Sequence, residues 1–287
     1  MRIPEQLRHL AGFPGGADWL ARLPRLVAEC VELWSLELGE PFPYAYVSVA
    51  APATLPDGTD AVLKVAFPHW ESEHEADALE HWDGHGAVRL LARDRERNAM
   101  LLERCVPGTS LLELPEEEGY ALAAEVARAL GGRPARADHP FTPFAVPAAR
   151  WAGELPRRWK EAGRPFERGL LDAAVAALRE LPPTQGELVV CSQDLHRGNI
   201  LAAEREPWLS IDPKPVVAER EVGTVALLRD GLGRIEWRLD FLASELGLDR
   251  ERMRGWGIAH TIAWGFAEHE PRVSPQHVEA ARRLWLA

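Results

Sequence analysis

The chain is poor in several features that mark particular classes of protein. Only three cysteines, Cys30, Cys105 and Cys191, occur in 287 residues, and they are widely spaced. An odd and scattered set argues against a disulfide framework and against a cysteine-based metal site, and it favours a reducing compartment. No apolar run approaches the roughly 18 to 20 residues that span a bilayer. Residues 1–8 also lack the apolar core of a signal peptide. We therefore expect a cytoplasmic protein with no membrane partner.

Positive charge is also scarce. The 33 lysines and arginines are outnumbered by 44 aspartates and glutamates, which gives a formal net charge of -11. This balance argues against a nucleic-acid partner, because such proteins carry basic surfaces. It suits a cationic small molecule drawn to an acidic cleft, although an acidic surface that keeps the protein soluble explains the charge at least as well.

The N-terminal half contains a strand pattern around one charged residue. Residues 44–51 and 61–67 are apolar and rich in β-branched side chains, and the turn signal at 55–58 predicts an antiparallel hairpin between them. Lys64 lies within the second strand. An ammonium group among apolar side chains needs a partner, because leaving it buried and unpaired is costly. The alternative is a lysine on an edge strand that faces water.

The residues after this hairpin supply a candidate partner for Lys64. Residues 71–83 predict a helix with Glu75 on its apolar face, although a solvated carboxylate is the alternative. A strand lysine followed by an inward glutamate on the next helix is the kinase arrangement, in which the lysine holds the α- and β-phosphates of ATP. Residues 87–91 and 100–102 complete a small sheet.

Proline and glycine break this pattern at residues 103–108. We interpret the break as a hinge between two lobes, where backbone groups around Glu103 and Cys105 would bind the adenine ring of ATP. The prediction is an N-terminal nucleotide-binding lobe over residues 1–104 and a C-terminal lobe over residues 105–287, the latter with the catalytic loop, metal site and acceptor-binding helices.

Helical spacing of apolar residues dominates outside the small sheet. At the N-terminus, residues 17–38 predict a helix whose main part begins near Pro24, with proline in the first turn. Beyond the hinge the predicted helices cover residues 115–130, 148–162 and 166–181, and three or four more follow residue 220. The fold class is therefore α+β, with a small antiparallel sheet in the N-terminal lobe and a mainly helical C-terminal lobe.

Residues 188–201 are the most informative stretch. A short apolar strand leads to Asp194, Asn199 follows five residues later, and a second apolar run ends on Asp212. This is the layout of a kinase catalytic loop and its metal-binding aspartate. Asp194 would orient the acceptor hydroxyl as a base, and the oxygens of Asn199 and Asp212 would suit Mg²⁺. Alone, each has a structural explanation as a helix cap, turn residue or strand exit.

Several phrases extend this pattern along the chain, including Val62-Leu-Lys-Val65, His81-Trp-Asp-Gly84, Met100-Leu-Leu-Glu-Arg104, Gln193-Asp-Leu-His-Arg-Gly-Asn199, Ile211-Asp-Pro-Lys214 and Leu227-Leu-Arg-Asp230. In these phrases the sequence resembles the aminoglycoside and hydroxyurea phosphotransferases, in particular the streptomycin 6-kinase branch. The resemblance implies a two-lobed, protein-kinase-like fold that transfers the γ-phosphate of ATP, with Mg²⁺, to a hydroxyl of an aminoglycoside-like or sugar-like acceptor. By that match Asp194 is the base, Asn199 and Asp212 hold Mg²⁺, and Lys64 with Glu75 anchors ATP.

Three departures from the family pattern stand out. Ser192 takes the place of a histidine found in many relatives, which we expect to loosen the hydrogen bonding of the loop. The hairpin that would cover the phosphates lacks a Gly-x-Gly-x-x-Gly motif. Lys214 is followed by Pro215 where relatives usually have glycine, which we expect to stiffen that segment. Lys214 itself is either a cation near the phosphates or part of a surface salt bridge.

The acceptor is the least constrained part of the prediction. Carboxylates near the C-terminus, namely Asp240, Glu268 and Glu270, are candidates to face a cationic acceptor, but a solvated helix face is the favoured explanation. His196 is expected to make a structural hydrogen bond rather than to act as an acid, base or metal ligand. Two other functions stay open: a metabolic kinase for a sugar or amino sugar, and a non-catalytic nucleotide-binding pseudokinase.

Overall fold

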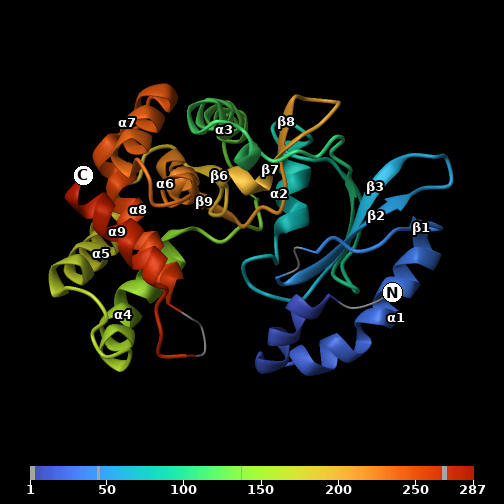
Figure 1. Ribbon diagram of the computed structural model, residues 1–287, viewed down its shortest axis with the longest axis horizontal. Helices are drawn as coiled ribbons and strands as arrows, with labels where there is room; N and C mark the ends of the chain where they lie inside the picture. The colour runs from blue at the N-terminus through green and yellow to red at the C-terminus, as the bar shows by residue number, and fades with distance from the viewer. Residues whose placement is uncertain (1–3, 44–45, 137, 267–269) are drawn as a thin grey trace. The chain divides into compact units, whose positions relative to one another are not determined.

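The computed structural model of the chain describes residues 4–43, 46–136, 138–266 and 270–287. The chain divides into two compact units (Figure 1). The first unit comprises Met1–Gly108 together with Ala202–Leu209, and the second comprises Thr109–Leu201 together with Ser210–Ala287. The lobe boundary expected between residues 104 and 105 stays a prediction.

The first unit is built on a five-stranded sheet with the strand order β1-β2-β3-β5-β4, in which all paired strands are antiparallel. The turn signal at Leu55–Gly58 does join β2 to β3, with Ala50 opposite Lys64. Gly58 has a φ of +86°, which glycine adopts without strain. The elements of this unit are η1 (Glu5–Gly12), α1 (Gly16–Trp34), β1 (Glu37–Leu38), β2 (Ser48–Thr54), β3 (Asp60–Ala66), α2 (Glu75–Trp82), β4 (Leu90–Asp94) and β5 (Ala99–Glu103).

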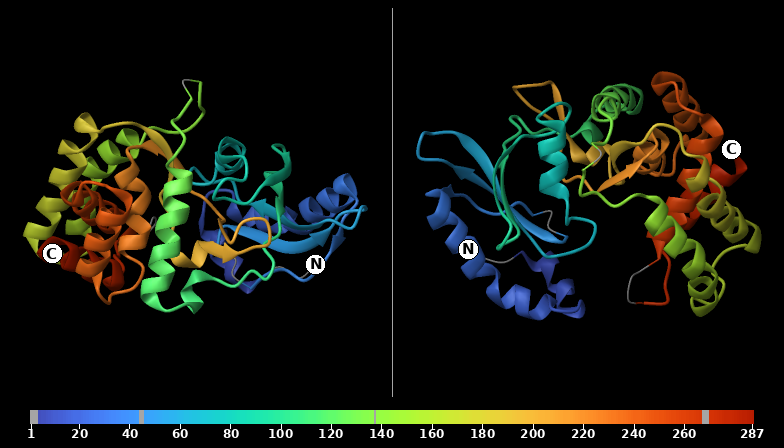
Figure 2. Two further views of the ribbon diagram at one scale, coloured as in Figure 1. Left: turned by 90° about the horizontal axis from the view of Figure 1, so that it is seen from above. Right: turned by 180° about the vertical axis from the view of Figure 1, so that it is seen from behind.

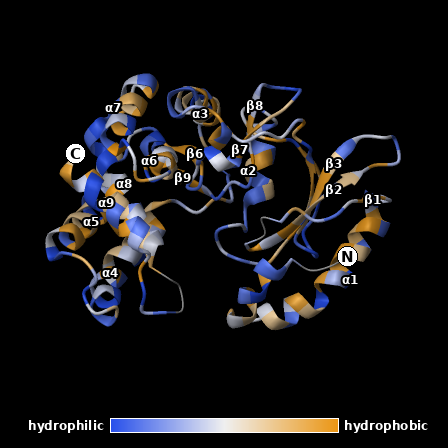
Figure 3. Ribbon diagram, viewed as in Figure 1, coloured by the Kyte–Doolittle hydropathy of each residue, from blue (hydrophilic) through white to orange (hydrophobic). Residues whose placement is uncertain are grey.

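Helices α1 and α2 cover opposite faces of this sheet (Figures 1 and 2). Because strand side chains alternate between the two faces, Leu63 and Val65 join the core under α1, together with Val27 of that helix. Lys64 lies on the other face, the one that α2 covers. Figure 3 shows β2 and β3 as predominantly hydrophobic segments, as expected for strands covered on both faces.

Several sequence-based boundaries in the first unit are wrong. The strand expected at 44–51 runs from Ser48 to Thr54, with residues 44 and 45 outside the described residues, and the strand expected at 87–91 runs from Leu90 to Asp94. Helix α1 begins at Gly16 and passes through Pro24, although Pro24 was expected near its start. Proline removes one helical hydrogen bond, but the burial of Trp19 and Leu23 before it and of Val27 after it stabilises a single continuous helix. Helix α2 is shorter than predicted and begins at Glu75.

The second unit is mainly helical, as predicted, and its centre is helix α8. Trp256 and Ile262 of α8 are fully buried, and the helix packs against α5 and α9. Strand β6, which leads into residues 193–199, pairs antiparallel with β9. The remaining elements are α3 (Glu116–Leu130), α4 (Ala145–Glu161), α5 (Arg168–Glu180), β6 (Val189–Ser192), β7 (Ile200–Ala202), β8 (Trp208–Ser210), β9 (Pro215–Ala218), α6 (Val225–Leu228), α7 (Ile235–Leu246), α8 (Arg250–Gly265) and α9 (Pro275–Leu286), with short 3₁₀ turns at Leu111–Glu113, Pro182–Thr184, Arg197–Asn199 and Arg220–Thr224.

Strands β7 and β8 form a separate hairpin, and its loop with the adjoining strand ends, Ala202–Leu209, is grouped with the first unit. Along the described residues, no helix combines the length and the apolar character that crossing a bilayer requires.

Candidate active site

Lys64 and Glu75 form a buried ion pair in the first unit. The Nζ of Lys64 donates to Oε1 of Glu75 over 2.5 Å, and the two residues are 5% and 1% exposed. Strand β3 lies between β2 and β5, so Lys64 is not on an edge strand. Both structural alternatives, a water-facing lysine and a solvated glutamate, are therefore wrong. The pair has the geometry that the kinase interpretation requires, and its role in ATP binding stays a prediction.

Glu103, at the expected hinge, uses its carboxylate within the first unit. Arg205 donates to both of its oxygens, over 2.8 and 2.9 Å, and the backbone N–H of Arg89 donates to one of them over 2.9 Å. Burial alone would raise the pKa of Glu103, but these hydrogen bonds outweigh burial and hold the pKa below its usual value. Burial raises the pKa of the Cys105 thiol to about 12, so this cysteine stays protonated. The Glu103 carboxylate is therefore already engaged, and adenine binding by the backbone around Glu103 and Cys105 stays a prediction.

Arg205 also fixes the Trp-Asp-Gly segment that precedes β4. Its guanidinium donates to the carbonyl oxygens of Gly84 over 2.7 Å and Ala87 over 3.0 Å. Gly84 has a φ of +80°, and a Cβ there would lie 2.9 Å from the side chain of Arg89. Arg205, in the loop of the β7–β8 hairpin, therefore binds a turn whose backbone conformation at position 84 requires glycine.

In the second unit, Ser192 stabilises the start of the candidate catalytic loop instead of loosening it. Its buried hydroxyl accepts from the backbone N–H of Asp194 over 3.3 Å and from that of Lys214 over 3.2 Å. The expectation of a looser loop was wrong, because a serine hydroxyl can bridge two backbone donors. His196 makes the expected structural hydrogen bond, in which Nδ1 accepts from the N–H of Gly198 over 3.1 Å.

The structure brings Asp194, Asn199 and the segment before Asp212 together. The side-chain amide of Asn199 donates to the backbone oxygen of Asp194 over 3.0 Å. The backbone oxygen of Asn199 accepts from the N–H of Ile211 over 2.9 Å. Asn199 therefore closes the loop on itself through its side chain and joins the loop to the segment before Asp212 through its backbone.

The side-chain oxygens of Asn199 and Asp212 are suited to bind Mg²⁺. The amide nitrogen of Asn199 is directed to Asp194, so the amide oxygen of Asn199 is the atom available to a cation. Asp212 adds a carboxylate. Hard Mg²⁺ prefers oxygen ligands and takes one or two from a protein when phosphates and water supply the others. No group of three or more His, Cys, Asp or Glu suited to a metal occurs among the residues that the structure describes.

Lys214 lies beside the predicted metal ligand. Its Nζ donates to Oδ1 of Asp212 over 2.7 Å, so Lys214 does form a salt bridge; the Lys214 side chain is buried, whereas that of Asp212 is 38% exposed. Asp212 has a φ of +50°, a region that residues other than glycine seldom adopt. Such strain is common where a side chain must be aimed at a functional site.

Sequence reasoning missed two arginines that hold the loop. Arg197 donates from its backbone and its Nε to Oδ2 of Asp230, over 3.3 and 2.9 Å, and its guanidinium lies 4.6 Å from the ring centre of Tyr120. Arg229 donates to Oδ1 of Asp194 over 3.2 Å. Both arginines lie in phrases that carry the family resemblance, Arg197 in Gln193–Asn199 and Arg229 in Leu227–Asp230, but nothing in those phrases indicated their contacts.

The carboxylates considered for a cationic acceptor have other partners. Asp240 accepts from Arg250 over 2.7 Å, and Glu270 pairs with Arg272 over 3.1 Å; both carboxylates are exposed. Glu268 lies outside the described residues. A solvated helix face, the favoured explanation, is confirmed for Asp240 on α7, whereas Glu270 is solvated but lies outside the helices.

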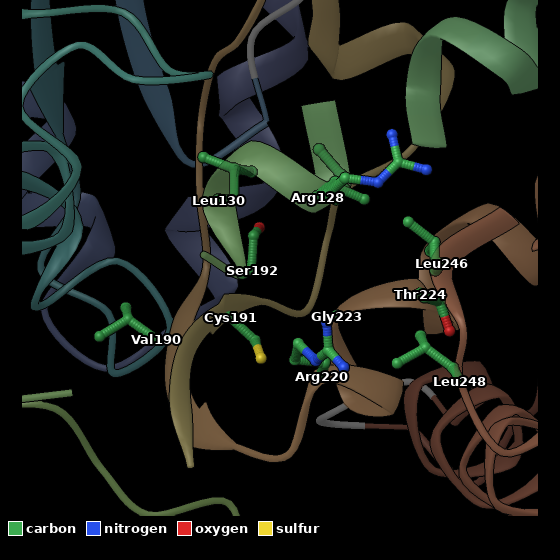
Figure 4. Close-up of a pocket in the computed structure, with 13 residues that line it drawn as sticks. Arg128, Leu130, Val190, Cys191, Ser192, Arg220, Gly223, Thr224, Leu246 and Leu248 are labelled. Carbon is green, nitrogen blue, oxygen red and sulfur yellow. The ribbon is translucent and has the colours of Figure 1, made fainter. Parts of the chain in front are cut away.

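A small cavity lies beside β6 in the second unit (Figure 4). Its volume is about 30 Å³, which is room for about two water molecules and too little for a nucleotide. Its lining includes Cys191, Ser192, Gly223 and Arg220. Burial raises the pKa of the Cys191 thiol to about 12, so the cavity offers no reactive thiolate.

Comparison with known proteins gives consistent results. Residues 35–269 match the aminoglycoside/hydroxyurea antibiotic resistance kinase family. The chain is 35% identical to a hydroxyurea phosphotransferase of Kitasatospora aureofaciens, covering 98% of this chain and 84% of the relative. It is 32% identical to a streptomycin 6-kinase of Streptomyces glaucescens, covering 94% of this chain and 91% of the relative.

Solved structures share the fold. A macrolide 2′-phosphotransferase from Brachybacterium faecium superposes with a TM-score of 0.57 at 17% identity, covering 90% of this chain and 96% of the other. A spectinomycin phosphotransferase in complex with ADP and spectinomycin gives 0.58 at 12% identity, covering 91% and 93%. The predicted protein-kinase-like fold is thus confirmed. The chain belongs to the aminoglycoside/hydroxyurea antibiotic resistance kinase family and is a nucleotide-dependent phosphotransferase that acts on a hydroxyl group.

Proposed function

We propose that this kinase transfers the γ-phosphate of ATP to a hydroxyl group of an aminoglycoside-type antibiotic resembling streptomycin. The observation that carries the proposal is the hydrogen-bonded loop in which Asn199 holds the backbone of Asp194 and pairs with the segment before Asp212. The streptomycin 6-kinases among the relatives support the acceptor class. Because the reaction consumes ATP and Cys30, Cys105 and Cys191 are free thiols, we place the activity in the cytoplasm.

Each predicted residue has a role in this reaction. Lys64, fixed by Glu75, binds the α- and β-phosphates of ATP, and the backbone around Glu103 and Cys105 receives the adenine ring. Asp194 accepts the hydrogen bond of the acceptor hydroxyl and orients the hydroxyl oxygen toward the γ-phosphorus. The acceptor oxygen forms the new P–O bond, the bond between the γ-phosphorus and the bridging oxygen breaks, ADP leaves, and the hydroxyl proton is released through Asp194.

Mg²⁺ would be held by Asn199 and Asp212. When bound, it neutralises charge on the β- and γ-phosphate oxygens. Lys214, already paired with Asp212, adds a second positive charge next to that carboxylate.

Hydroxyurea is a second candidate acceptor. The hydroxyurea phosphotransferase of Kitasatospora aureofaciens is similar along almost the whole chain. Hydroxyurea also offers a hydroxyl group to phosphorylate, but it is small and uncharged, so the two acceptors place different demands on the binding site.

The test is a turnover assay with purified protein, ATP, MgCl₂ and a panel of acceptors: streptomycin, other aminoglycosides, hydroxyurea and simple sugars. We expect ADP release and a product that is heavier by one phosphate with streptomycin. The variant Asp194→Ala should lose at least about 100-fold in kcat, while calorimetric titration with MgATP still shows binding. Full activity of Asp194→Ala would show that Asp194 is not the base. Turnover with hydroxyurea or a sugar, but not with any aminoglycoside, would show that the proposed acceptor class is wrong.

A further inference from the structure

The carboxylate of Asp194 has an unusual partner for a catalytic base, the guanidinium of Arg229. Arg229 directly follows helix α6, and its Nη2 lies 3.2 Å from Oδ1 of Asp194. The side chain of Arg229 is 10% exposed and that of Asp194 is 20% exposed. An ion pair this sheltered is screened much less by water and salt than the surface pairs of the chain.

A closed ring of hydrogen bonds holds Arg229 in place. Its Nη1 lies 3.0 Å from Nδ1 of His260, and Nε2 of His260 lies 3.3 Å from Oε1 of Gln193. Gln193 is buried and directly precedes Asp194 in the chain. The ring therefore runs from Asp194 through Arg229 and His260 to Gln193, and the peptide bond between Gln193 and Asp194 closes it.

The chemistry of arginine fixes the protonation state within this ring. A guanidinium only donates, so Nδ1 of His260 must be the acceptor, and the proton of the neutral imidazole lies on Nε2. That proton is then donated to Oε1 of Gln193. Burial, followed by the charge of Arg229 and by His277, lowers the pKa of His260 well below its usual value, which agrees with a neutral ring.

Aromatic rings restrict the guanidinium further. The Arg229 guanidinium carbon lies 4.7 Å from the ring centre of Trp264, and the His260 ring lies 4.6 Å from the same indole. Phe144 also stacks with the His260 ring, and Trp151 contacts that ring edge to face. Arg229 is thus held by a cation–π contact as well as by hydrogen bonds, and neither it nor His260 can turn without disturbing the other.

We propose that Arg229 is a positioning residue for the phosphotransfer, and that His260 acts through it. This inference rests on the proposed function. Arg229 engages Oδ1 of Asp194 and so fixes the rotamer of the carboxylate, which points Oδ2 at the acceptor hydroxyl. A purely structural pair would contribute only to stability, whereas a positioning pair affects turnover, because small misplacements of a catalytic group can cost about 100-fold in rate.

The first experiment compares Arg229→Ala with the wild type in the acceptor assay. We expect kcat to fall about 100-fold while the KM for ATP changes less than about twofold, and guanidinium chloride at millimolar concentration should restore part of kcat by refilling the site. Arg168→Ala, which removes an exposed arginine paired with Asp172, is the matched control and should keep wild-type kcat.

A second pair of variants tests the ring and does not remove the ion pair. His260→Asn keeps an acceptor near Nδ1 for Arg229, whereas His260→Gln places its amide near Nε2 and loses that acceptor. We expect His260→Gln to reduce kcat more than His260→Asn does, with similar melting temperatures for both. This pair also keeps the inference testable when Arg229→Ala does not fold.

The outcomes separate the two proposals. If the wild type is active and folded Arg229→Ala keeps kcat within twofold, the inference is overturned and the proposed function stands. A loss of kcat that follows the loss of thermal stability and does not respond to guanidinium also overturns it. If the wild type phosphorylates no acceptor in the panel, the proposed function fails and this inference fails with it.

Discussion

The two units hold their charged residues in different ways. In the first, Lys64 and Glu75 are almost fully buried, lie 2.5 Å apart and are placed by a central strand and the first residue of a helix. In the second, Asp194 and Arg229 lie 3.2 Å apart on loop segments, and a ring through His260 and Gln193 holds them. The first pair depends on regular secondary structure, and the second depends on side-chain hydrogen bonds that tolerate little change.

Breaking the buried pair should have the largest effect on stability. Glu75→Ala leaves the Lys64 ammonium buried without its carboxylate, which we expect to cost about 3–5 kcal/mol of unfolding free energy. The double variant Lys64→Met with Glu75→Leu should regain most of that loss but not ATP binding. Urea unfolding followed by circular dichroism measures both. If the single variant were as stable as the wild type, the pair would not be a determinant of this unit's stability.

In the second unit, the side chain of Asn199 combines two roles, as a hydrogen-bond donor to Asp194 and as a predicted metal ligand. Asn199→Ala removes both the predicted metal ligand and the hydrogen bond to Asp194, and we expect about tenfold more Mg²⁺ to be needed for half-maximal turnover, in the range seen when metal sites lose a supporting group.

Asn199→Asp is its control, since it keeps an oxygen for the metal but loses the donor to the Asp194 carbonyl. Its Mg²⁺ requirement should stay near that of the wild type while kcat falls. An unchanged Mg²⁺ requirement in Asn199→Ala would remove Asn199 from the metal site.

The smallest expected effect is the change of stability with pH that His277, which lies near Arg229, produces. Burial and then the charge of Arg229 lower the pKa of His277 to about 4, from a usual value near 6.5. Between these values the unfolded chain binds a proton that the folded chain does not. Stability is therefore fully present above pH 6.5 and decreases as the pH falls toward 4.

The melting temperature should accordingly drop between pH 7 and pH 5, and His277→Gln should make that drop smaller. His260 acts in the same direction and accounts for part of the drop that remains. An identical pH dependence in the wild type and His277→Gln would show that His277 does not titrate in this range.

The difference between the two pairs also explains what the sequence could predict. Lys64 and Glu75 are 11 residues apart, and the alternation of a strand and the turn of a helix place them on facing surfaces. Asp194 and Arg229 are 35 residues apart, with strands and turns between them. No periodic pattern relates two loop residues at that distance, so their contact depends on the packed fold.

The predictions for Pro24 and Ser192 failed because of contacts that each residue or its neighbours make in the fold. Pro24 indicated a helix start because proline favours first turns, but the buried residues on both sides of it decided the outcome. Ser192 was judged by the histidine it replaces, which concealed what its own hydroxyl bonds. The identities of the loop residues were readable from their spacing, whereas the arginines that hold them were not.

The β7–β8 hairpin has a consequence for how the protein is made. Its residue Arg205 completes the hydrogen bonding of Glu103, Gly84 and Ala87, yet it is synthesised about a hundred residues after them. The first unit therefore cannot reach its final state on the ribosome until much of the second has emerged, although domains usually fold in order of synthesis. A nascent chain stalled before residue 205 should expose a protease-sensitive Trp-Asp-Gly segment that the finished chain protects.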